Sequence, residues 1–164
     1  MTDKIIKTVK DSQIEMTEYV MPNDTNILGN LAGGRLMFWI DIACALAASK
    51  HCMTVAVTAQ VDNLVFHYPI KLGEIVKLKA SVNRAFNTSM EVGVRVEVED
   101  FRTGVVKHSN SAYLTFVSID METGQKVKVP QIKPETEEEI RRYEQALKRR
   151  EQRLSGKHGI VSKP

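Results

Sequence analysis

The spacing of apolar and polar residues changes along the chain, and each change predicts a different kind of element. Between residues 34 and 50 apolar side chains fall on every side of a helical wheel. The segment is rich in alanine and leucine, contains no proline and follows the pair Gly33-Gly34. The pattern therefore predicts one long helix, roughly 34–50, that is buried nearly all round.

Elsewhere the apolar residues recur every second position, which predicts strands. Expected strands cover 14–20 before the helix and 54–66, 75–86, 90–99 and 105–117 after it. Both faces of 54–66 are substantially apolar, so this strand is expected in the middle of the sheet. The three later strands place apolar residues inward and polar ones outward, among them Asn83, Glu91 and Ser109. Such alternation is typical of an antiparallel sheet covered on one side, with hairpin turns expected at 87–89 and 102–104.

A second helix is expected near the end of the chain, over 135–154. Thr136 and Glu139 have the spacing of a capping box, and the acidic start and basic end of the segment suit the helix dipole. Its narrow apolar stripe favours a solvated helix packed on the domain over a helix that binds nucleic acid or a partner. The polar residues 155–164 are expected to form a flexible tail.

These elements predict an α+β fold with a single domain over 1–154. One sheet of about five antiparallel strands must cover the long helix, so the sheet should curl around it. This arrangement is the hot-dog fold. A single wrapped sheet leaves open edges, and pairing two of them in a homodimer is the simplest way to cover them.

Composition narrows the class of protein. The 164 residues are 43% hydrophobic and 26% charged, as in soluble globular proteins. A net charge of +3 is too small to argue for nucleic acid, although it is compatible with an anionic small ligand. Arg35 and Asp41 interrupt the apolar run, which argues against a membrane span.

The cysteines indicate a reducing compartment. Cys44 and Cys52 would lie about 12 Å apart on a helix that rises ~1.5 Å per residue, which is beyond the reach of a disulfide. With no signal-like start, we expect a cytoplasmic protein. The pair His51-Cys52 lacks the further ligands of a zinc site, so we expect no metal.

Asp41 is the first functional candidate. A carboxylate in a buried helix costs several kcal/mol to desolvate unless it is paired or lines a cavity. It could instead be structural, paired with Arg35 or Lys50, or it could point to water where the helix emerges.

Several motifs then carry a resemblance. Residues 22–26 (Pro-Asn-Asp-Thr-Asn), Gly33-Gly34, Trp39-Ile40-Asp41 and the 87–91 segment (Asn-Thr-Ser-Met-Glu) are similar to the signature of hot-dog acyl-CoA thioesterases. The chain most resembles the brain-type acyl-CoA hydrolases and their single-domain bacterial relatives, over roughly 15–153. The resemblance implies hydrolysis of acyl-CoA to free acid and coenzyme A, with no metal or organic cofactor.

The resemblance also implies roles for residues. The catalytic aspartate of the family corresponds to Asp41 and its catalytic asparagine to Asn26. Because the two residues of one working site come from different repeats in two-domain relatives, each site here would combine Asn26 of one subunit with Asp41 of another. Relatives also assemble as three dimers in a hexamer.

Thioester chemistry assigns these residues to steps. Asp41 would act as general base toward water or attack directly as nucleophile, and the sequence leaves both open. Asn26 would orient the water or donate to the carbonyl oxygen. Backbone N–H groups of Gly33 and Gly34, at the positive helix start, are expected oxyanion donors, although the glycines could also serve close packing.

Other candidates concern the two ends of the substrate. The phosphates of coenzyme A are expected to be held by Arg84, Asn87 and Ser89. The alternative is that these are ordinary polar residues of a hairpin with no role in binding. Phe38, Phe66 and Met90 are expected to line the slot for the acyl chain.

Two rival functions use the same fold. A non-catalytic regulator that binds acyl-CoA or a nucleotide is the alternative, but DNA-binding regulators of this type carry an additional helix-turn-helix module, for which few residues precede the first strand. A dehydratase would want a histidine on the helix where this chain has Asp41.

Overall fold

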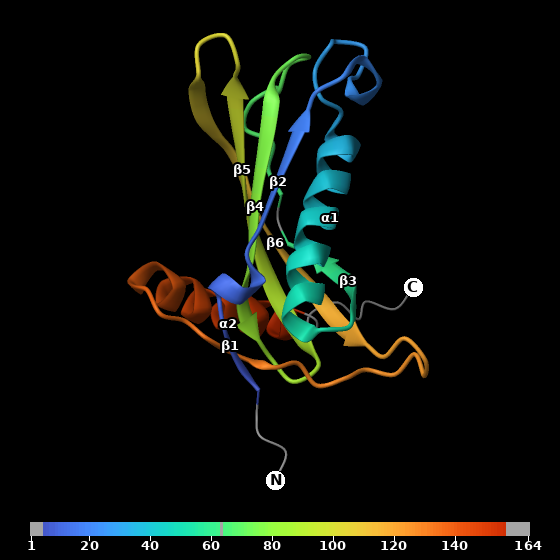
Figure 1. The fold of residues 1–164 in the computed structure, drawn as a ribbon, viewed down its shortest axis with the longest axis vertical. Helices are drawn as coiled ribbons and strands as arrows, with labels where there is room; N and C mark the ends of the chain where they lie inside the picture. Colours follow the sequence, from blue (N-terminus) through green and yellow to red (C-terminus); the bar gives the residue numbers. More distant parts are fainter. Residues whose placement is uncertain (1–4, 63, 157–164) are drawn as a thin grey trace.

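A computed structural model describes residues 5–62 and 64–156 (Figure 1). The two α-helices and seven strands follow in the order β1 (Ile6–Thr8), β2 (Ile14–Tyr19), α1 (Gly33–Cys52), β3 (Val55–Val61), β4 (Ile75–Ala85), β5 (Ser89–Asp100), β6 (Val105–Ile119), β7 (Gln131–Lys133) and α2 (Glu137–Gly156). Short 3-10 turns cover Lys10–Ser12 and Pro22–Asp24. The predicted α+β class and both predicted helices are confirmed.

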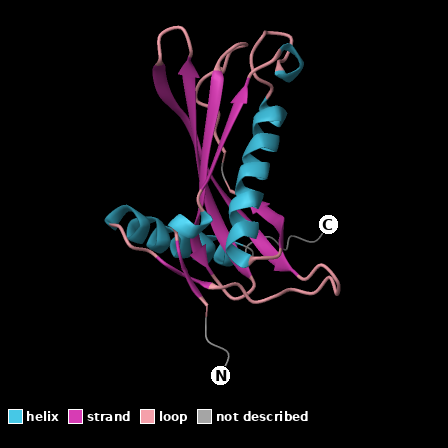
Figure 2. Ribbon diagram, viewed as in Figure 1, coloured by secondary structure: helices cyan, strands magenta, loops and turns pink. Residues whose placement is uncertain are grey.

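Five strands form one antiparallel sheet in the order β2-β4-β5-β6-β3. The sheet curls along α1, which lies against one face with its axis roughly along the long strands (Figures 1 and 2). The core between them contains the inward residues of β4, β5 and β6, including Leu78, Val92 and Phe116, all buried. This is the hot-dog arrangement expected from the pattern.

The position of β3 differs from the prediction. Two apolar faces suggested a strand in the middle of the sheet, but β3 pairs only with β6 and forms an edge of the described sheet. Val55, Val57 and Val61 of β3 are exposed. The exposed apolar side chains of this strand are therefore free to pack against another subunit.

The burial of α1 was also predicted wrongly. One side of the helix packs on the sheet through Leu36, Trp39 and Ile40, but Phe38 is 54% exposed and Leu46 is 49% exposed. A helix that is apolar all round is expected to be covered on both sides. The sheet of this chain covers only one side of α1. The exposed side of α1 lies beside β3, with which the helix is in contact.

Helix α2 crosses the opposite face of the sheet from α1 (Figure 1). Its capping box is present, because the Glu139 N–H donates to Thr136 Oγ1 at 3.2 Å and the Thr136 N–H to a carboxylate oxygen of Glu139 at 3.2 Å. The helix extends to Gly156, so the first two residues of the expected tail are helical. The rest of that tail, residues 157–164, lies outside the described residues.

Polar residues on the outer face of the sheet are buried where α2 covers them. Glu91 was predicted to face solvent, yet it is completely buried and pairs with Arg149 of α2 through bonds of 2.7 and 3.0 Å. Asn83, also predicted outward, donates to Glu91 at 3.1 Å. The Arg149 guanidinium lies 3.7 Å from the centre of the Tyr113 ring. Ion pairing, rather than the narrow apolar stripe alone, docks this helix.

A second, two-stranded sheet was not predicted. β1 and β7 pair in parallel, and β7 lies between the predicted strand 105–117 and the predicted helix 135–154, where no strand was expected. Lys7 of β1 donates to the carbonyls of Lys50 and His51 at 2.9 and 3.0 Å, which satisfies acceptors that the end of α1 leaves free. This pairing holds the N-terminal segment against the C-terminus of the long helix.

Candidate active site

Asp41 lies halfway along α1, partly exposed on the side of the helix next to β3. The hydroxyl of Thr58 on β3 donates to Asp41 Oδ1 at 2.5 Å. Neither ion pair considered for Asp41 is formed, because Arg35 pairs with Asp24 at 3.0 Å and Lys50 donates to the carbonyl of Gln13 at 3.1 Å. Asp41 is therefore a carboxylate with one oxygen fixed by Thr58 at the boundary between helix and edge strand.

Thr58 is the neighbour that the sequence did not identify as part of the site. It lies in a strand whose alternation predicted only burial, and threonine is ordinary in strands. The register between β3 and β6 shifts just after Thr58, and such a bulge re-aims the side chains beside it.

Cys44 lies one turn along α1 from Asp41 and is completely buried. Burial, with a smaller contribution from the Asp41 charge, raises the pKa of the Cys44 thiol. The thiol therefore stays protonated, so Cys44 is no competing nucleophile beside the carboxylate. Both cysteines are free, as expected.

Asn26 forms the turn that leads into α1. Its side-chain oxygen accepts from the backbone N–H groups of Leu28 and Asn30 at 3.0 and 3.3 Å, and its own N–H donates to the carbonyl of Asn30 at 2.8 Å. Because the oxygen is occupied by two donors, the side-chain NH2 is the part of Asn26 left to act on a ligand. The geometry favours a donor role for this amide.

Gly33 and Gly34 begin α1 and are exposed. The first N–H groups of a helix have no intrahelical partner, and no side chain caps this helix start. A Cβ on Gly33 would lie 3.5 Å from the Phe66 ring, and one on Gly34 would meet nothing within 4 Å. Close packing does not require either glycine, and their N–H groups stay accessible to an anion.

A cavity of about 290 Å³ opens at this end of α1. It brings together three of the predicted residues, Asn26, Gly33 and Phe66, and is completed by Asn30, Leu31, Leu36 and residues 67–70. The cavity therefore combines polar groups, among them Asn26, with apolar side chains such as Leu36 and Phe66.

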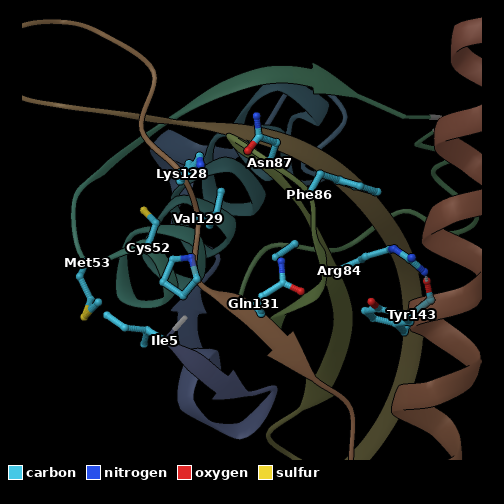
Figure 3. A pocket seen from close by; sticks show the side chains of 12 residues that line it. Ile5, Cys52, Met53, Arg84, Phe86, Asn87, Lys128, Val129, Gln131 and Tyr143 are labelled. Atoms are coloured by element: carbon cyan, nitrogen blue, oxygen red, sulfur yellow. Dashed lines mark hydrogen bonds between the residues drawn. The ribbon is translucent and has the colours of Figure 1, made fainter. Parts of the chain in front are cut away.

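A larger cavity, of about 960 Å³, lies at the other end of α1 (Figure 3). Arg84 and Asn87, both predicted to hold phosphates, line it beside Lys128, which the sequence did not single out. The Arg84 guanidinium lies 3.9 Å from the centre of the Tyr143 ring and donates to the Tyr143 carbonyl at 3.2 Å. The cavity combines cationic side chains with aromatic rings.

The remaining predicted residues lie elsewhere. Ser89 faces α2, where its hydroxyl contacts Arg150 at 3.4 Å. Met90 is completely buried in the core, and Phe38 lies on the exposed side of α1. Neither side chain lines the two cavities described above, so their roles as acyl contacts stay predictions.

Two further properties concern the described ranges as a whole. Residues 5–62 and 64–156 contain no group of three or more His, Cys, Asp or Glu side chains that could hold a metal ion. Neither α1 nor α2 combines the length and the apolar character that crossing a bilayer requires.

Known proteins resemble this chain over most of its length. The thioesterase superfamily model matches residues 28–105. VdlD of Helicobacter pylori is 38% identical over 161 residues, which are 95% of this chain and 91% of that one. A hexameric acyl-CoA thioesterase, solved in the apo form, superposes with a TM-score of 0.89 and is 38% identical over 96% of this chain and 99% of that one.

An acyl-CoA hydrolase from Staphylococcus aureus adds a comparison at the site. It was solved with butyryl-coenzyme A, coenzyme A and coenzyme A disulfide, and is 35% identical with a TM-score of 0.84 over 94% of this chain and 96% of that one. Mutants of that hydrolase change an asparagine, an aspartate and a threonine to alanine. The three positions have the same intervals along the sequence as Asn26, Asp41 and Thr58 here. By its sequence and by its fold, this chain belongs to the thioesterase superfamily, within the acyl-CoA hydrolases of the hot-dog fold.

Proposed function

We propose that this protein hydrolyses acyl-CoA thioesters to a free carboxylic acid and coenzyme A. The observation that carries the proposal is the Asp41 carboxylate, fixed by the Thr58 hydroxyl at 2.5 Å on the partly exposed side of α1 next to β3. The coincidence of Asn26, Asp41 and Thr58 with the three mutated positions of the Staphylococcus aureus hydrolase supports it.

In the proposed reaction the free oxygen of Asp41 takes a proton from a water as that water attacks the thioester carbonyl. A C–O bond forms, the C–S bond breaks, and the thiolate of coenzyme A leaves and takes up the proton that Asp41 removed from the water, which returns Asp41 to its carboxylate form. Direct attack by the carboxylate, followed by hydrolysis of the anhydride, is the competing route. Thr58 serves both routes, because it fixes the carboxylate in one orientation.

The negative charge that develops on the carbonyl oxygen needs donors. The NH2 group of Asn26 and the N–H groups of Gly33 and Gly34 are the proposed donors, and each such group is worth about 2.7–4 kcal/mol in comparable sites. They meet at the start of α1, where the helix dipole favours negative charge.

Helix geometry supports a site shared by two subunits. Asp41 follows Gly33 by eight residues, which is about 12 Å along a helix that rises ~1.5 Å per residue. The donors and the carboxylate of one chain are therefore too far apart to contact one carbonyl group. Asn26 of one subunit and Asp41 of another would have to meet.

The exposed edge strand β3 offers the contact for such a dimer. An unpaired strand edge beside apolar side chains favours association with a second copy. A two-fold axis normal to the sheet would pair the two β3 strands antiparallel and set the two α1 helices antiparallel as well. This arrangement moves the Gly33 end of the partner helix toward Asp41, and the exposed Phe38 and Leu46 become interface residues.

The cavity in Figure 3 is the proposed site for the nucleotide end of coenzyme A. Cys52, at its edge, lies eleven residues from Asp41 along α1, or about 16 Å, a distance that an extended pantetheine arm can bridge. Lys128 and Arg84 would face the phosphates, with Asn87 as a further contact. Ser89, which contacts Arg150 instead, is left out of this proposed site. The acyl chain would occupy the cavity beside Phe66.

We further propose that the dimers assemble as a trimer of dimers in the cytoplasm. The hexameric thioesterase to which the chain is similar supports the assembly. The two free cysteines suit a reducing compartment. No nucleic acid, membrane or cofactor has a part in the proposed reaction.

The test is release of coenzyme A from acyl-CoA of increasing chain length, followed with a thiol-reactive dye. Wild-type protein should turn over at least one chain length, and Asp41→Ala should lower kcat by about 10²–10⁴-fold with the oligomer unchanged. If wild-type protein binds these compounds tightly but releases coenzyme A from none of them, the result would favour the non-catalytic regulator. Full activity of Asp41→Ala would contradict the assignment of this residue.

A further inference from the structure

Strand β6 contains a bulge at which two successive polar residues are buried. The register with β5 shifts between Val96 and Glu97, so Val96 pairs with Asn110 and Glu97 with His108. Ser109, the inserted residue, was expected on the outer face, yet it is only 3% exposed, and Asn110 is 1% exposed. A bulge with two buried polar side chains needs partners for both.

The partner of Asn110 is the loop after β3. The NH2 group of Asn110 donates to the Val65 carbonyl, and the Ser109 hydroxyl donates to Asn110 Oδ1 at 2.5 Å. Ser109 therefore fixes the amide in the orientation that points its donor at the loop. Both members of the bulge contribute to one connection.

This connection lies in the middle of a long crossing segment. The segment is attached at one end by the Asp62 N–H, which donates to the Tyr113 carbonyl at 2.9 Å, and at the other by the Leu31 N–H, which donates to the Ile70 carbonyl at 2.6 Å. Residues 64–69 have no helix or strand between these points. For the described part of the segment, the Asn110 bond is the backbone attachment between its two ends.

The residue after Val65 is Phe66, whose ring lies against Gly33 at 3.5 Å from the position of a Cβ. Phe66 is 48% exposed, so packing in the core does not hold its ring. It nevertheless forms a wall of the cavity that also contains Asn26. The placement of this wall depends on the carbonyl that Asn110 holds.

We propose that Asn110 is a positioning residue that sets the acyl-chain selectivity of the enzyme by holding Phe66 over the start of α1. The inference rests on the proposed function, because the cavity beside Phe66 is the proposed acyl site and the test measures acyl-CoA hydrolysis. Asn110 touches no substrate, and its effect passes through the Val65 carbonyl and the neighbouring aromatic ring.

The test is a double-mutant cycle read over a series of saturated acyl-CoA substrates from butyryl to palmitoyl. Phe66→Ala should lower kcat/KM about tenfold for the chain lengths preferred by wild type and flatten the selectivity profile. Asn110→Ala should reproduce that profile. The double variant should be no worse than the worse single variant, because both changes remove the same wall.

A matched control separates positioning from folding. Ser111→Ala changes the next, exposed residue of the same strand and should leave the profile unchanged. If Asn110→Ala folds poorly, Asn110→Leu takes its place, because it keeps the volume of the buried side chain and still removes the donor to the Val65 carbonyl. A wild-type profile in Phe66→Ala overturns the proposal, as do additive losses in the double variant.

A second readout does not depend on activity. Hydrogen exchange of the Asp62 and Leu31 amides, whose hydrogen bonds attach the two ends of the segment, should be faster in Asn110→Ala than in wild type or Ser111→Ala. If wild-type protein hydrolyses no acyl-CoA, the proposed function fails while exchange still tests the connection. Unchanged exchange in these residues would overturn the positioning role whatever the activity.

Discussion

At the scale of single residues, the site depends on which atoms of each polar side chain are already hydrogen-bonded within the protein and which are left for the substrate. Asn26 uses its carbonyl oxygen to build its own turn, and that leaves the NH2 group for the substrate. Asp41 has one oxygen bound by Thr58. The sequence predicted Asn26 and Asp41 through a motif and the cost of a charge in an apolar helix, but it could not predict Thr58, because that contact depends on the strand packed beside α1.

The Thr58 contact gives the first prediction at this scale. Thr58→Val keeps the shape of the side chain but removes the donor to Asp41. A hydrogen bond to a charged group is worth about 1.5–3 kcal/mol, so kcat for acyl-CoA hydrolysis should fall about 10–100-fold. Steady-state kinetics with the best substrate measure it.

Thr115→Val is the matched control. It makes the same change on β6 at a buried hydroxyl with no hydrogen-bond partner among the described residues, and it should leave kcat within about twofold. Equal rates for wild type and Thr58→Val would show that Asp41 does not need this contact.

The buried His51 gives a second prediction at this scale. Its Nε2 bonds to the Pro130 carbonyl at 2.9 Å, and burial lowers the pKa of the imidazole below its ordinary value of 6.5. The folded protein binds this proton more weakly than the unfolded chain does. The stability contributed by neutral His51 is therefore fully present above pH 6.5 and is lost as the pH falls below it, by at most about 1.4 kcal/mol per pH unit.

Urea unfolding between about pH 5 and pH 7.5 measures this dependence. His51→Gln can still donate to the Pro130 carbonyl but has no proton to gain, so its stability should fall less steeply with acid than that of wild type. His108→Gln, which changes an exposed histidine, should keep the wild-type slope. Identical slopes for wild type and His51→Gln would contradict the account.

At the scale of elements, the pattern located both helices and the five strands of the main sheet, and it found the capping box of α2. It failed where an element's environment comes from a distant part of the chain. Alternation assigned Glu91 to solvent, but the ion pair with Arg149 is made after α2 docks. Two apolar faces suggested a central position for β3, although a partner subunit can cover an edge strand in the same way.

The docking of α2 gives a third prediction. Arg149→Met leaves the fully buried Glu91 without its main partner, which typically costs about 3–5 kcal/mol. Arg153, at 3.8 Å from Glu91, still compensates part of the charge, so we expect a loss near 3 kcal/mol. Chemical unfolding at neutral pH measures it.

Arg142→Met on the same helix is the control. Arg142 pairs at 2.6 Å with Glu138, which is 60% exposed, and loss of such a surface pair should cost about 0.5 kcal/mol or less. Equal stability of the two variants would mean that the Glu91 contact does not dock α2.

At the scale of the whole molecule, the exposed surfaces and the separation of the site residues lead to the same assembly. Apolar side chains remain exposed along α1 and β3, and the donors at the start of α1 are about 12 Å along the helix axis from Asp41. A second copy that pairs through β3 would cover these apolar side chains. It would also bring the donors of one subunit close to Asp41 of the other. The sequence predicted a dimer from the open edges of the sheet, and the family resemblance implied a site shared between its subunits. The edge position of β3 supports the pairing.

The most direct test of the shared site is complementation between two inactive variants. Asn26→Ala and Asp41→Ala proteins, each lacking one half of the site, are mixed and allowed to exchange subunits, with exchange followed by native mass spectrometry. Every hybrid dimer would contain one intact site, so random mixing should restore about a quarter of the wild-type rate of coenzyme A release. No recovery in a sample with proven hybrid dimers would contradict a site built from two subunits.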